Sequence, residues 1–454
     1  MHKMIFKIKK GLEIPIQGKP DPTKVYSVNT STVGILGNDF HGMKPTMLVK
    51  EDDSVVKGQP LFEDKKNPGV IFTAPVSGKV SSINRGDRRA FLSLVIEKNF
   101  NDNNQIEFST SQHLSDLNDD NIVNLLVKSG TWTAFKTRPF SKVPKIEDRP
   151  DEIFISLIDS NPLSVDPEQI IESEINMFNE GLAVLSRLPR NSLNISTKPE
   201  CSIKKLDKDN VTYYEFSGPH PVGLVGTQIH NISPASLSNQ IWTIGYQDVV
   251  MIGKLFNTGI LDNQKKIALT GPMVKDPSII DSENGANLDD ILTDKVIGEN
   301  NRIISGSVLT GSESVNPVNF LGRYHNQITV LREVTKNDRE FLNFLRPGLL
   351  KHSFLRIFFT KLNEKKLNLN YSTAMNGSDR AIVPLGIYED IFPYKIMITQ
   401  LLRSIVIGDT EAAQKLGVLE LEEEDLALCT YSCPSKYDYG SLLREMLTKI
   451  EEEG

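Results

Sequence analysis

The residues with the clearest potential for chemistry lie in one glycine- and proline-rich segment, 217–231, which reads SGPHPVGLVGTQIHN. It follows a strand-like run at 211–216 (VTYYEF). A glycine-rich turn at the carboxyl end of a strand is where open α/β sheets bind ligands. The segment carries two imidazoles, His220 and His230, and the indole of Trp242 follows nearby. It therefore predicts a ligand site, with a loop shaped only for packing as the alternative.

The same segment does not fit a dinucleotide. Dinucleotide loops need glycines at the spacing G-x-G-x-x-G and backbone N–H groups aimed at phosphate. Here the glycines stand at 218, 223 and 226, and Pro219 and Pro221 have no N–H to donate. No lysine or arginine occurs from Asp209 to Gly253. A neutral, partly apolar loop favours an uncharged, ring-shaped ligand with carbonyl acceptors over a pyrophosphate.

A second segment, 131–140 (TWTAFKTRPF), combines aromatic rings with two cations and ends at a proline. We expect a loop here. It could be a wall of the ligand site, or a hydrophobic staple between domains.

The composition of the whole chain is that of an ordinary globular protein. With 454 residues, of which 39% are hydrophobic and 24% charged, the chain should form roughly three soluble domains.

Composition also excludes several function classes. The net charge of -7 gives no reason to expect nucleic acid as a partner, because nucleic acid requires a basic surface. No apolar run approaches the ~20 residues of a membrane span, and the first residues lack the apolar core of a signal peptide. Three cysteines indicate a reducing compartment. If the chain serves a membrane process, we expect it to do so as a peripheral part on the cytoplasmic side.

Turn-rich strands in the first hundred residues predict a small barrel-sandwich. The pattern D-x-V-x-x-G-Q-x-L … A-P-x-S-G-x-V, at 53–61 and 74–80, resembles biotinyl and lipoyl carrier domains. Those carriers modify a lysine at a hairpin tip, and Lys65 and Lys66 stand in about that place. The Pro-Gly turn after them does not match a carrier tip. We therefore expect an interaction surface, with a covalent carrier as the alternative.

Strand and helix patterns alternate from about residue 118, which favours a parallel, Rossmann-like sheet. Asp166-Pro167 is a strong helix start, an N-cap followed by proline. Runs at 265–269, 288–292 and 302–309 read as strand, short helix and strand, the order of a β-grasp module. The predicted fold is multidomain α/β with four units: a barrel-sandwich (1–100), a Rossmann-like domain (101–260), a β-grasp, SLBB-like domain (261–330) and a C-terminal helical domain (331–454).

The last unit holds two further motifs. The acidic run 420–425 reads most simply as a solvated face. Cys429 and Cys433 form a Cys-x-x-x-Cys-Pro motif before a helix. Iron–sulfur clusters usually need four thiolates, and Cys201 is the only other cysteine, so the chain cannot hold such a cluster alone. Buried structural thiols are the default expectation, with a zinc site completed by histidine as an alternative.

Taken together, the blocks resemble the NqrA family, whose members belong to Na+-translocating NADH:quinone oxidoreductases. Nine blocks run in order along the chain, among them KKGLEIPI near Lys9, LFEDKKNPGVIFTAPVSGKV from Leu61, GPHPVG from Gly218 and EEDLALCTYSCPSKYDYG from Glu423. The resemblance implies a respiratory complex of six subunits that oxidises NADH, reduces ubiquinone and exports sodium. It places flavins and iron–sulfur centres in the five partners (B, C, D, E and F), and no cofactor or metal in this chain.

The resemblance and the residues lead to one hypothesis. The chain would be a peripheral subunit on the cytoplasmic face of the bacterial inner membrane that carries or borders a ubiquinone site. Its quinone contacts would be His220 as donor to a ring carbonyl, Trp132, Phe135 and Phe140 as stacking or walling rings, and Arg138 as a cation for the reduced ring. The alternatives are a vestigial NADH-binding enzyme and a purely structural assembly subunit.

Overall fold

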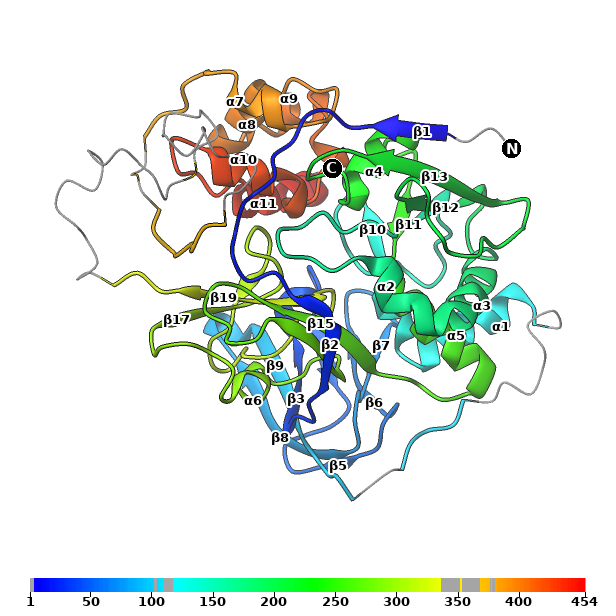
Figure 1. The fold of residues 1–454 in the computed structure, drawn as a ribbon. Helices are drawn as coiled ribbons and strands as arrows, with labels where there is room; N and C mark the ends of the chain where they lie inside the picture. Colours follow the sequence, from blue (N-terminus) through cyan, green and yellow to red (C-terminus); the bar gives the residue numbers. More distant parts are fainter. Residues whose placement is uncertain are drawn as a thin grey trace.

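The computed structural model describes residues 4–101, 104–108, 117–335, 352, 368–375, 377 and 380–453. Two six-stranded sheets, a smaller two-sheet sandwich and a set of C-terminal helices make up these residues. In Figure 1 the sandwich lies below the third sheet, the α/β sheet lies at the upper right, and the C-terminal helices lie at the upper left. The sandwich and the α/β domain share one apolar core. Within the described residues, no helix combines the length and the apolarity that crossing a membrane requires.

The first domain is a barrel-sandwich, as predicted. One sheet contains β3 (Thr32–Leu36), β9 (Phe91–Lys98), β8 (Gly78–Arg85) and β5 (Ser54–Val55). The other contains β4 (Pro45–Met47), β6 (Pro60–Asp64) and β7 (Ile71–Thr73). At the turn between β6 and β7, Lys65 and Lys66 are exposed, but the side-chain amide of the next residue, Asn67, donates to the carbonyls of Val143 and Pro144. The turn is thus fastened to the rest of the protein at this point.

The second domain is built on a sheet in the order β1-β13-β12-β11-β14-β10. Its strands are β1 (Met4–Lys7), β13 (Val211–Ser217), β12 (Ser192–Thr197), β11 (Glu152–Ser156), β14 (Ile241–Thr243) and β10 (Lys136–Arg138). All neighbouring pairs are parallel except β10 with β14. A parallel sheet buries both faces, and β11 accordingly directs Ile153 and Ile155 into one apolar cluster and Phe154 into another.

Helices cover both faces of this sheet. They are α1 (Asp119–Lys128), α2 (Pro167–Ile171), α3 (Ile175–Leu185), α4 (Val225–Ile232) and α5 (Tyr246–Thr258). Asp166 caps α2 with proline at its first position, as predicted. Helices α3 and α5 cross closely because Gly181 and Gly253 lie at the contact: a Cβ on Gly253 would stand 1.8 Å from the carbonyl oxygen of Met177. Only glycine allows the two backbones to approach this far.

The third sheet has the order β18-β17-β19-β15-β16-β2 and carries one short helix. Its elements are β2 (Asp21–Ser27), β15 (Gln264–Thr270), β16 (Ser278–Glu283), α6 (Leu288–Leu292), β17 (Asn301–Ser305), β18 (Ser312–Glu313) and β19 (Gln327–Arg332). The strand, short helix and strand predicted here are confirmed. Two strands from the start of the chain join the other sheets: β2 pairs with β16 in this sheet, and β1 pairs with β13 in the α/β sheet (Figure 1).

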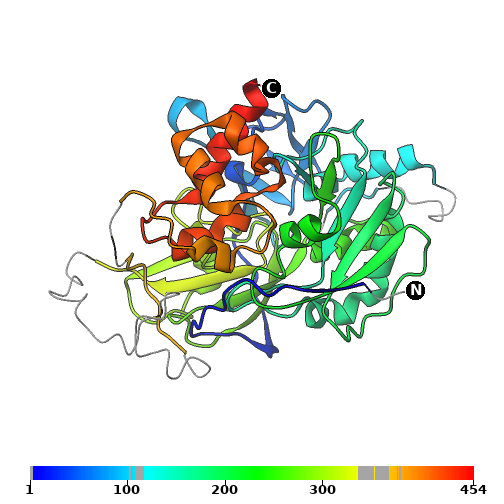
Figure 2. The ribbon, with the colours of Figure 1, turned by 90° about the horizontal axis from the view of Figure 1, so that it is seen from above.

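The C-terminal part is helical, as predicted, although residues 336–351 and 353–367 at its start lie outside the described residues. The helices are α7 (Ile387–Ile391), α8 (Ile398–Ile407), α9 (Thr410–Lys415), α10 (Ala427–Ser432) and α11 (Tyr439–Glu453). Leu443, Met446, Leu447 and Ile450 of the last helix are buried in an apolar core that they share with the other C-terminal helices. Seen from above in Figure 2, these helices lie across the edges of the neighbouring domains.

One local prediction is wrong. Residues 131–140 are not a simple loop: Thr131–Ala134 form a 3₁₀ turn, and Lys136–Arg138 form strand β10, antiparallel to β14. Local sequence did not reveal this strand because it is three residues long and its partner lies about a hundred residues further on. The consequence is that Lys136 and Arg138 are held on a rigid sheet edge.

Candidate ligand cleft and its buried charge network

A cleft of about 920 Å³ opens at the carboxyl edge of the parallel sheet. The α/β domain contributes Ser156 from the end of β11, residues 223–225 of the glycine- and proline-rich loop, and residues 243–248 from the end of β14 into α5. The other three domains close the remaining sides, through residues 38–41, 306–312 and 422–424 among others. Carboxyl edges of such sheets are the usual place for a ligand, and here the edge is covered by all four parts of the chain.

The lining of the cleft is strongly acidic. Carboxylate side chains outnumber lysines and arginines: Asp39, Asp159, Asp248, Glu422, Glu423, Glu424, Asp438 and Glu445 stand against Lys136 and Arg444. A field of this sign repels phosphates and other anions. The cleft is therefore unsuited to a dinucleotide, in agreement with the neutral loop at its edge.

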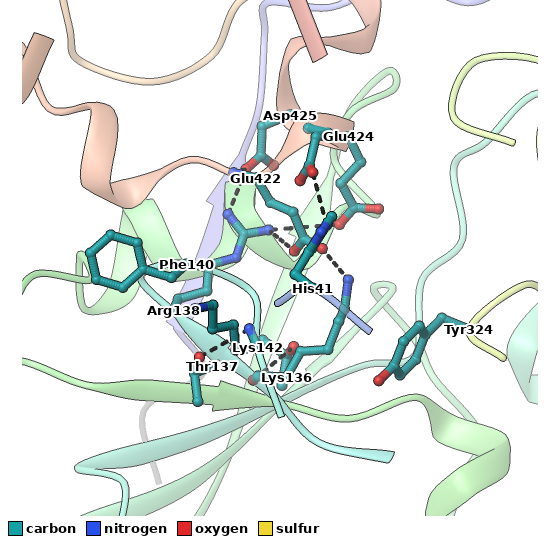
Figure 3. Close-up of polar contacts among 12 residues, drawn as sticks. His41, Lys136, Thr137, Arg138, Phe140, Lys142, Tyr324, Glu422, Glu424 and Asp425 are labelled. Carbon is teal, nitrogen blue, oxygen red and sulfur yellow. Dashed lines mark hydrogen bonds and ion pairs between the residues drawn. The ribbon is translucent and has the colours of Figure 1, made fainter. Parts of the chain in front are cut away.

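A buried ion-pair network lies at one wall of the cleft (Figure 3). Arg138 on β10 is 1% exposed. Its Nη1 donates to Asp425 Oδ2 at 2.5 Å and to the carbonyl of Glu420 at 2.9 Å, and its Nη2 donates to Glu422 Oε2 at 3.0 Å. Burial would lower the pKa of Arg138, but the carboxylates of Asp425 and Glu422 more than offset it and raise that pKa.

The neighbouring groups complete this network. Lys136, also on β10, pairs with Glu422, and Lys136 and Arg138 together hold the pKa of Glu422 below its usual value despite its burial. Glu424 lies farther out, 3.7 Å from Arg138. Burial and the charge of Glu422 raise the pKa of Glu424 to about 8. At neutral pH Glu424 therefore carries a proton, which lowers the repulsion among the three carboxylates.

A second cluster joins the same turn to the first two domains. Glu423 accepts from Arg444 Nε at 2.5 Å and Nη2 at 2.7 Å, and from His41 Nε2 at 3.1 Å. Arg444 also donates to the carbonyl of Phe140 at 2.8 Å. The sequence alone suggested that the acidic run 420–425 is a solvated face, and the structure shows instead that it is largely engaged in contacts within the protein. Its side chains are the contacts that hold the C-terminal helices over the cleft.

His220 lies behind one wall of this cleft. Its ring is 1% exposed, and its Nδ1 stands 3.0 Å from Ser160 Oγ, which accepts from the backbone N–H of Gly223 at 2.8 Å. This arrangement is satisfied if Ser160 donates to Nδ1, which leaves the ring proton on Nε2. Nε2 has no hydrogen-bond partner among the described residues. Burial lowers the pKa of His220 to about 4, so the imidazole is neutral at physiological pH.

The other predicted contacts occupy two different environments. Trp132 and Phe135 are fully buried in the main core, where their ring centroids are 5.4 Å apart and both pack against Trp242. Trp132 Nε1 donates to the carbonyl of Pro144 at 2.9 Å. Phe140 is half-buried against the C-terminal helical core. The structure thus places Trp132 and Phe135 behind the wall formed by Ala134 and Lys136. It engages both terminal nitrogens of Arg138 with Asp425, Glu422 and the carbonyl of Glu420, while Nε has no hydrogen-bond partner among the described residues.

The described cysteines are not arranged as a metal centre. Cys429 and Cys433 are buried, and Cys433 Sγ accepts from the hydroxyls of Tyr388 at 3.2 Å and Tyr439 at 3.4 Å. Among the described residues, no group of three or more histidine, cysteine, aspartate or glutamate side chains is placed to hold a metal ion. Sequence reasoning found His220 and Arg138 but missed Asp39, Tyr246, Tyr324 and His325, because no local motif marks them.

Three family descriptions match successive parts of the chain. They are "NqrA N-terminal barrel-sandwich hybrid domain" at residues 6–99, "NqrA second alpha/beta domain" at 117–261 and "NQRA C-terminal domain" at 266–316. Each match falls on one of the sheets described above. Together they cover more than half of the sequence.

Curated relatives match over nearly the whole length. The NqrA proteins of the Na(+)-translocating NADH-quinone reductases from Marinomonas sp. (strain MWYL1), Yersinia pestis and Hahella chejuensis (strain KCTC 2396) are each 47% identical over 450 residues, which is 99% of this chain and 100% of theirs. A solved NAD+-reducing [NiFe]-hydrogenase aligns with 75% of this chain and 62% of its own, at 11% identity and a TM-score of 0.39, a score too low to support any argument.

Proposed function

Because the chain belongs to the NqrA family of the Na+-translocating NADH-quinone reductase, we propose that it is the peripheral, cytoplasmic-side subunit that holds or borders the ubiquinone site of that complex. Members of this family are parts of an oxidoreductase that translocates sodium. In this proposal the partners are the five other subunits, B to F, which carry the flavins and iron–sulfur centres. Rossmann-like and β-grasp (SLBB-like) are the finer domain assignments that go with it.

The observation that carries the proposal is the cleft at the carboxyl edge of the parallel sheet. Its volume of about 920 Å³ is enough for a quinone ring and the first part of its tail. Its acidic lining and the prolines of its loop disfavour a nucleotide. A quinone is neutral and needs only hydrogen bonds to two carbonyl oxygens and a flat apolar wall. The cleft provides apolar surface at Leu224, Val225, Ile244 and Leu309.

Of the five predicted contact residues, this proposal gives one a direct contact with the quinone and the other four indirect roles. His220, whose buried Nε2 has no partner among the described residues, is the candidate donor to a ring carbonyl. Trp132 and Phe135 support the wall at Ala134 from behind. Arg138 influences the ring only through the carboxylates that it holds, and Phe140 packs the C-terminal helices in place.

Calorimetric titration of the isolated protein tests this proposal. A short-chain ubiquinone should bind at micromolar concentration with one site, and NADH should show no heat of binding up to millimolar concentration. The variant His220→Ala should weaken ubiquinone binding. Saturable binding of NADH, or absence of ubiquinone binding, would remove the basis of the proposal.

A structural assembly role without a ligand of its own is the second candidate. The observation that favours it is that the predicted contacts are engaged within the protein: both terminal nitrogens of Arg138 bind carboxylates, and Trp132 and Phe135 are core residues. This candidate predicts that inhibitor-resistance mutations at the quinone site map wholly to other subunits. It also predicts a flat titration with ubiquinone.

A further inference from the structure

A compact group of titratable residues lies where the first three domains meet, outside the network of Figure 3. Asp39, from the barrel-sandwich, is half-buried and lines both the large cleft and a second, 80 Å³ cavity. Its Oδ2 accepts from the backbone N–H of Arg323 at 2.8 Å. The guanidinium of Arg323 pairs with Asp248 of α5 at 2.7 Å. Lys265 on β15 donates to the carbonyl of Arg323 at 2.9 Å.

Asp39 Oδ1 and the ring of His325 both lie beside Gly322. A Cβ built on Gly322 would lie 3.2 Å from Asp39 Oδ1 and 2.4 Å from His325 Nδ1. His325 Nδ1 also stands 2.9 Å from Ser305 Oγ. Asp39 and His325 both line the cleft. A carboxyl from the first domain and an imidazole from the third therefore border the cleft close to the same glycine.

Burial brings the pKa values of two members of this group, Asp39 and Lys265, close to neutral pH. Burial raises the pKa of Asp39 to about 6, partly opposed by the N–H of Arg323 and by the cations Arg323, Lys265 and Lys136. Burial lowers the pKa of Lys265 to about 8. Burial and the nearby Lys265 lower the pKa of His325 to about 4. Groups that exchange protons near pH 7 beside a cleft are candidates for proton transfer.

We infer that Asp39 is the proton donor to a quinone bound in the cleft, through its oxygen Oδ1, because Oδ2 is held by the backbone N–H of Arg323. The inference rests on the proposed function, because it places the quinone in this cleft. Asp39 is suited to the role by position, since it reaches the cleft from a rigid turn and its second oxygen is fixed by a backbone N–H.

The electrons and protons that the quinone takes up can both be accounted for. Quinone takes up two electrons, which the NADH-quinone reductase reaction delivers, and two protons. The O–H bond of the Asp39 carboxyl breaks and an O–H bond forms at a carbonyl oxygen of the reduced ring. The Asp39 carboxylate that remains is stabilised by the N–H of Arg323 and the nearby cations. A proton from solvent then reloads Asp39, which delivers the second proton to the reduced ring in the same way.

The test uses the assembled complex with Asp39→Asn, which keeps the acceptor for the N–H of Arg323 but cannot donate an acidic proton. We expect ubiquinone reduction to fall at least about tenfold in kcat, within the range that general acids contribute, while the apparent KM for ubiquinone changes little. The fall of the wild-type rate as pH rises through about 6 should disappear. Electron transfer from NADH to ferricyanide, which takes no protons, should be unchanged. Asp39→Glu should restore part of the rate.

Asp87→Asn is the matched control, because Asp87 is an exposed carboxylate of the same domain outside the cleft. If ubiquinone still binds in the cleft but Asp39→Asn keeps the wild-type rate and pH profile, the inference is wrong and the proposed function stands. If no ubiquinone binds in the cleft, both are wrong. A ferricyanide rate that falls as much as the ubiquinone rate would assign Asp39 a structural role and overturn the inference.

Discussion

Arg138 and Asp425 are 287 residues apart in the sequence, and their side chains meet at 2.5 Å where almost no solvent reaches either of them. This contact joins an edge strand of the α/β sheet to the turn that precedes α10. Buried charges stabilise a structure only when each has its partners. The pair is therefore one of the buried contacts that hold the C-terminal helices over the cleft, beside the pair of Lys136 with Glu422.

Replacing Arg138 by methionine should release those helices. Asp425 would be left buried without its cation and Glu422 with Lys136 alone, at a cost of roughly 3–5 kcal/mol. Hydrogen exchange should show loss of protection in α10 and α11 before the barrel-sandwich. Arg190→Met is the control, because Arg190 is 65% exposed in its pair with Asp151, and exposed pairs contribute at most ~1 kcal/mol. Equal loss of protection in the two variants would show that the ion pairs of Arg138 do not hold α10 and α11 in place.

A rise in pH should lower the stability of the C-terminal helices, because Glu424 loses its proton beside Glu422. The pKa of Glu424 is about 8 in the folded protein, above the value near 4.3 of an unfolded chain. Between these values the unfolded state has released a proton that the folded state still holds, so the free energy of unfolding falls as pH rises and levels off above 8. Urea unfolding of the C-terminal helices from pH 5 to 9 should show this slope. It should be smaller in Glu424→Gln and unchanged in Glu445→Gln, whose side chain is exposed.

The crossing of α3 and α5 should not tolerate a side chain. In Gly181→Ala the added Cβ would stand 2.0 Å from the carbonyl oxygen of Val249, so the helices must separate. We expect a loss of about 3 kcal/mol, the upper end of overpacking costs. Gly440→Ala is the control, because its nearest neighbour would be at 3.5 Å in the first turn of α11. Thermal unfolding that ranks the two variants equally would contradict the packing described.

Substitutions at the predicted quinone contacts should fall into two kinds, those that lower the stability of the protein and those that lower its affinity for ubiquinone. Trp132→Ala removes a core side chain and should cost roughly 3–5 kcal/mol of stability. His220→Ala removes a ring whose Nε2 has no described partner, so its main effect should be about a tenfold loss of ubiquinone affinity, the value of one hydrogen bond. His220→Gln, which keeps an N–H donor, should restore most of that affinity. An unchanged affinity in His220→Ala would place the ring donor elsewhere.

Local signals predicted the local structure well. The cap at Asp166 with Pro167 and the short helix Leu288–Leu292 are both in place, because each depends on residues within one or two turns. The barrel-sandwich was also recognisable from its turns. The same signals failed for β1, β2 and β10, whose partners are about a hundred residues or more away.

The candidate site was predictable only in part for the same reason. The glycine- and proline-rich loop was correctly expected at the end of a strand, and it does border a cleft. The acidic run was misjudged because a row of glutamates is usually solvated, and nothing near it in sequence indicated that Lys136 and Arg138 would meet it. Asp39 and His325 come from different domains, and only the fold brings them together.

The central claim is that a neutral quinone, and not a nucleotide, binds at the carboxyl edge of the parallel sheet. Methyl NMR of the isolated protein during titration with a short-chain ubiquinone tests it most directly. The account predicts saturable shifts at the cleft methyls of Leu224, Val225, Ile244 and Leu309, none at Leu94 and Ile96 in the barrel-sandwich core, and none anywhere with NADH. Saturable shifts confined to residues outside the cleft, or the same cleft shifts with NADH, would contradict it.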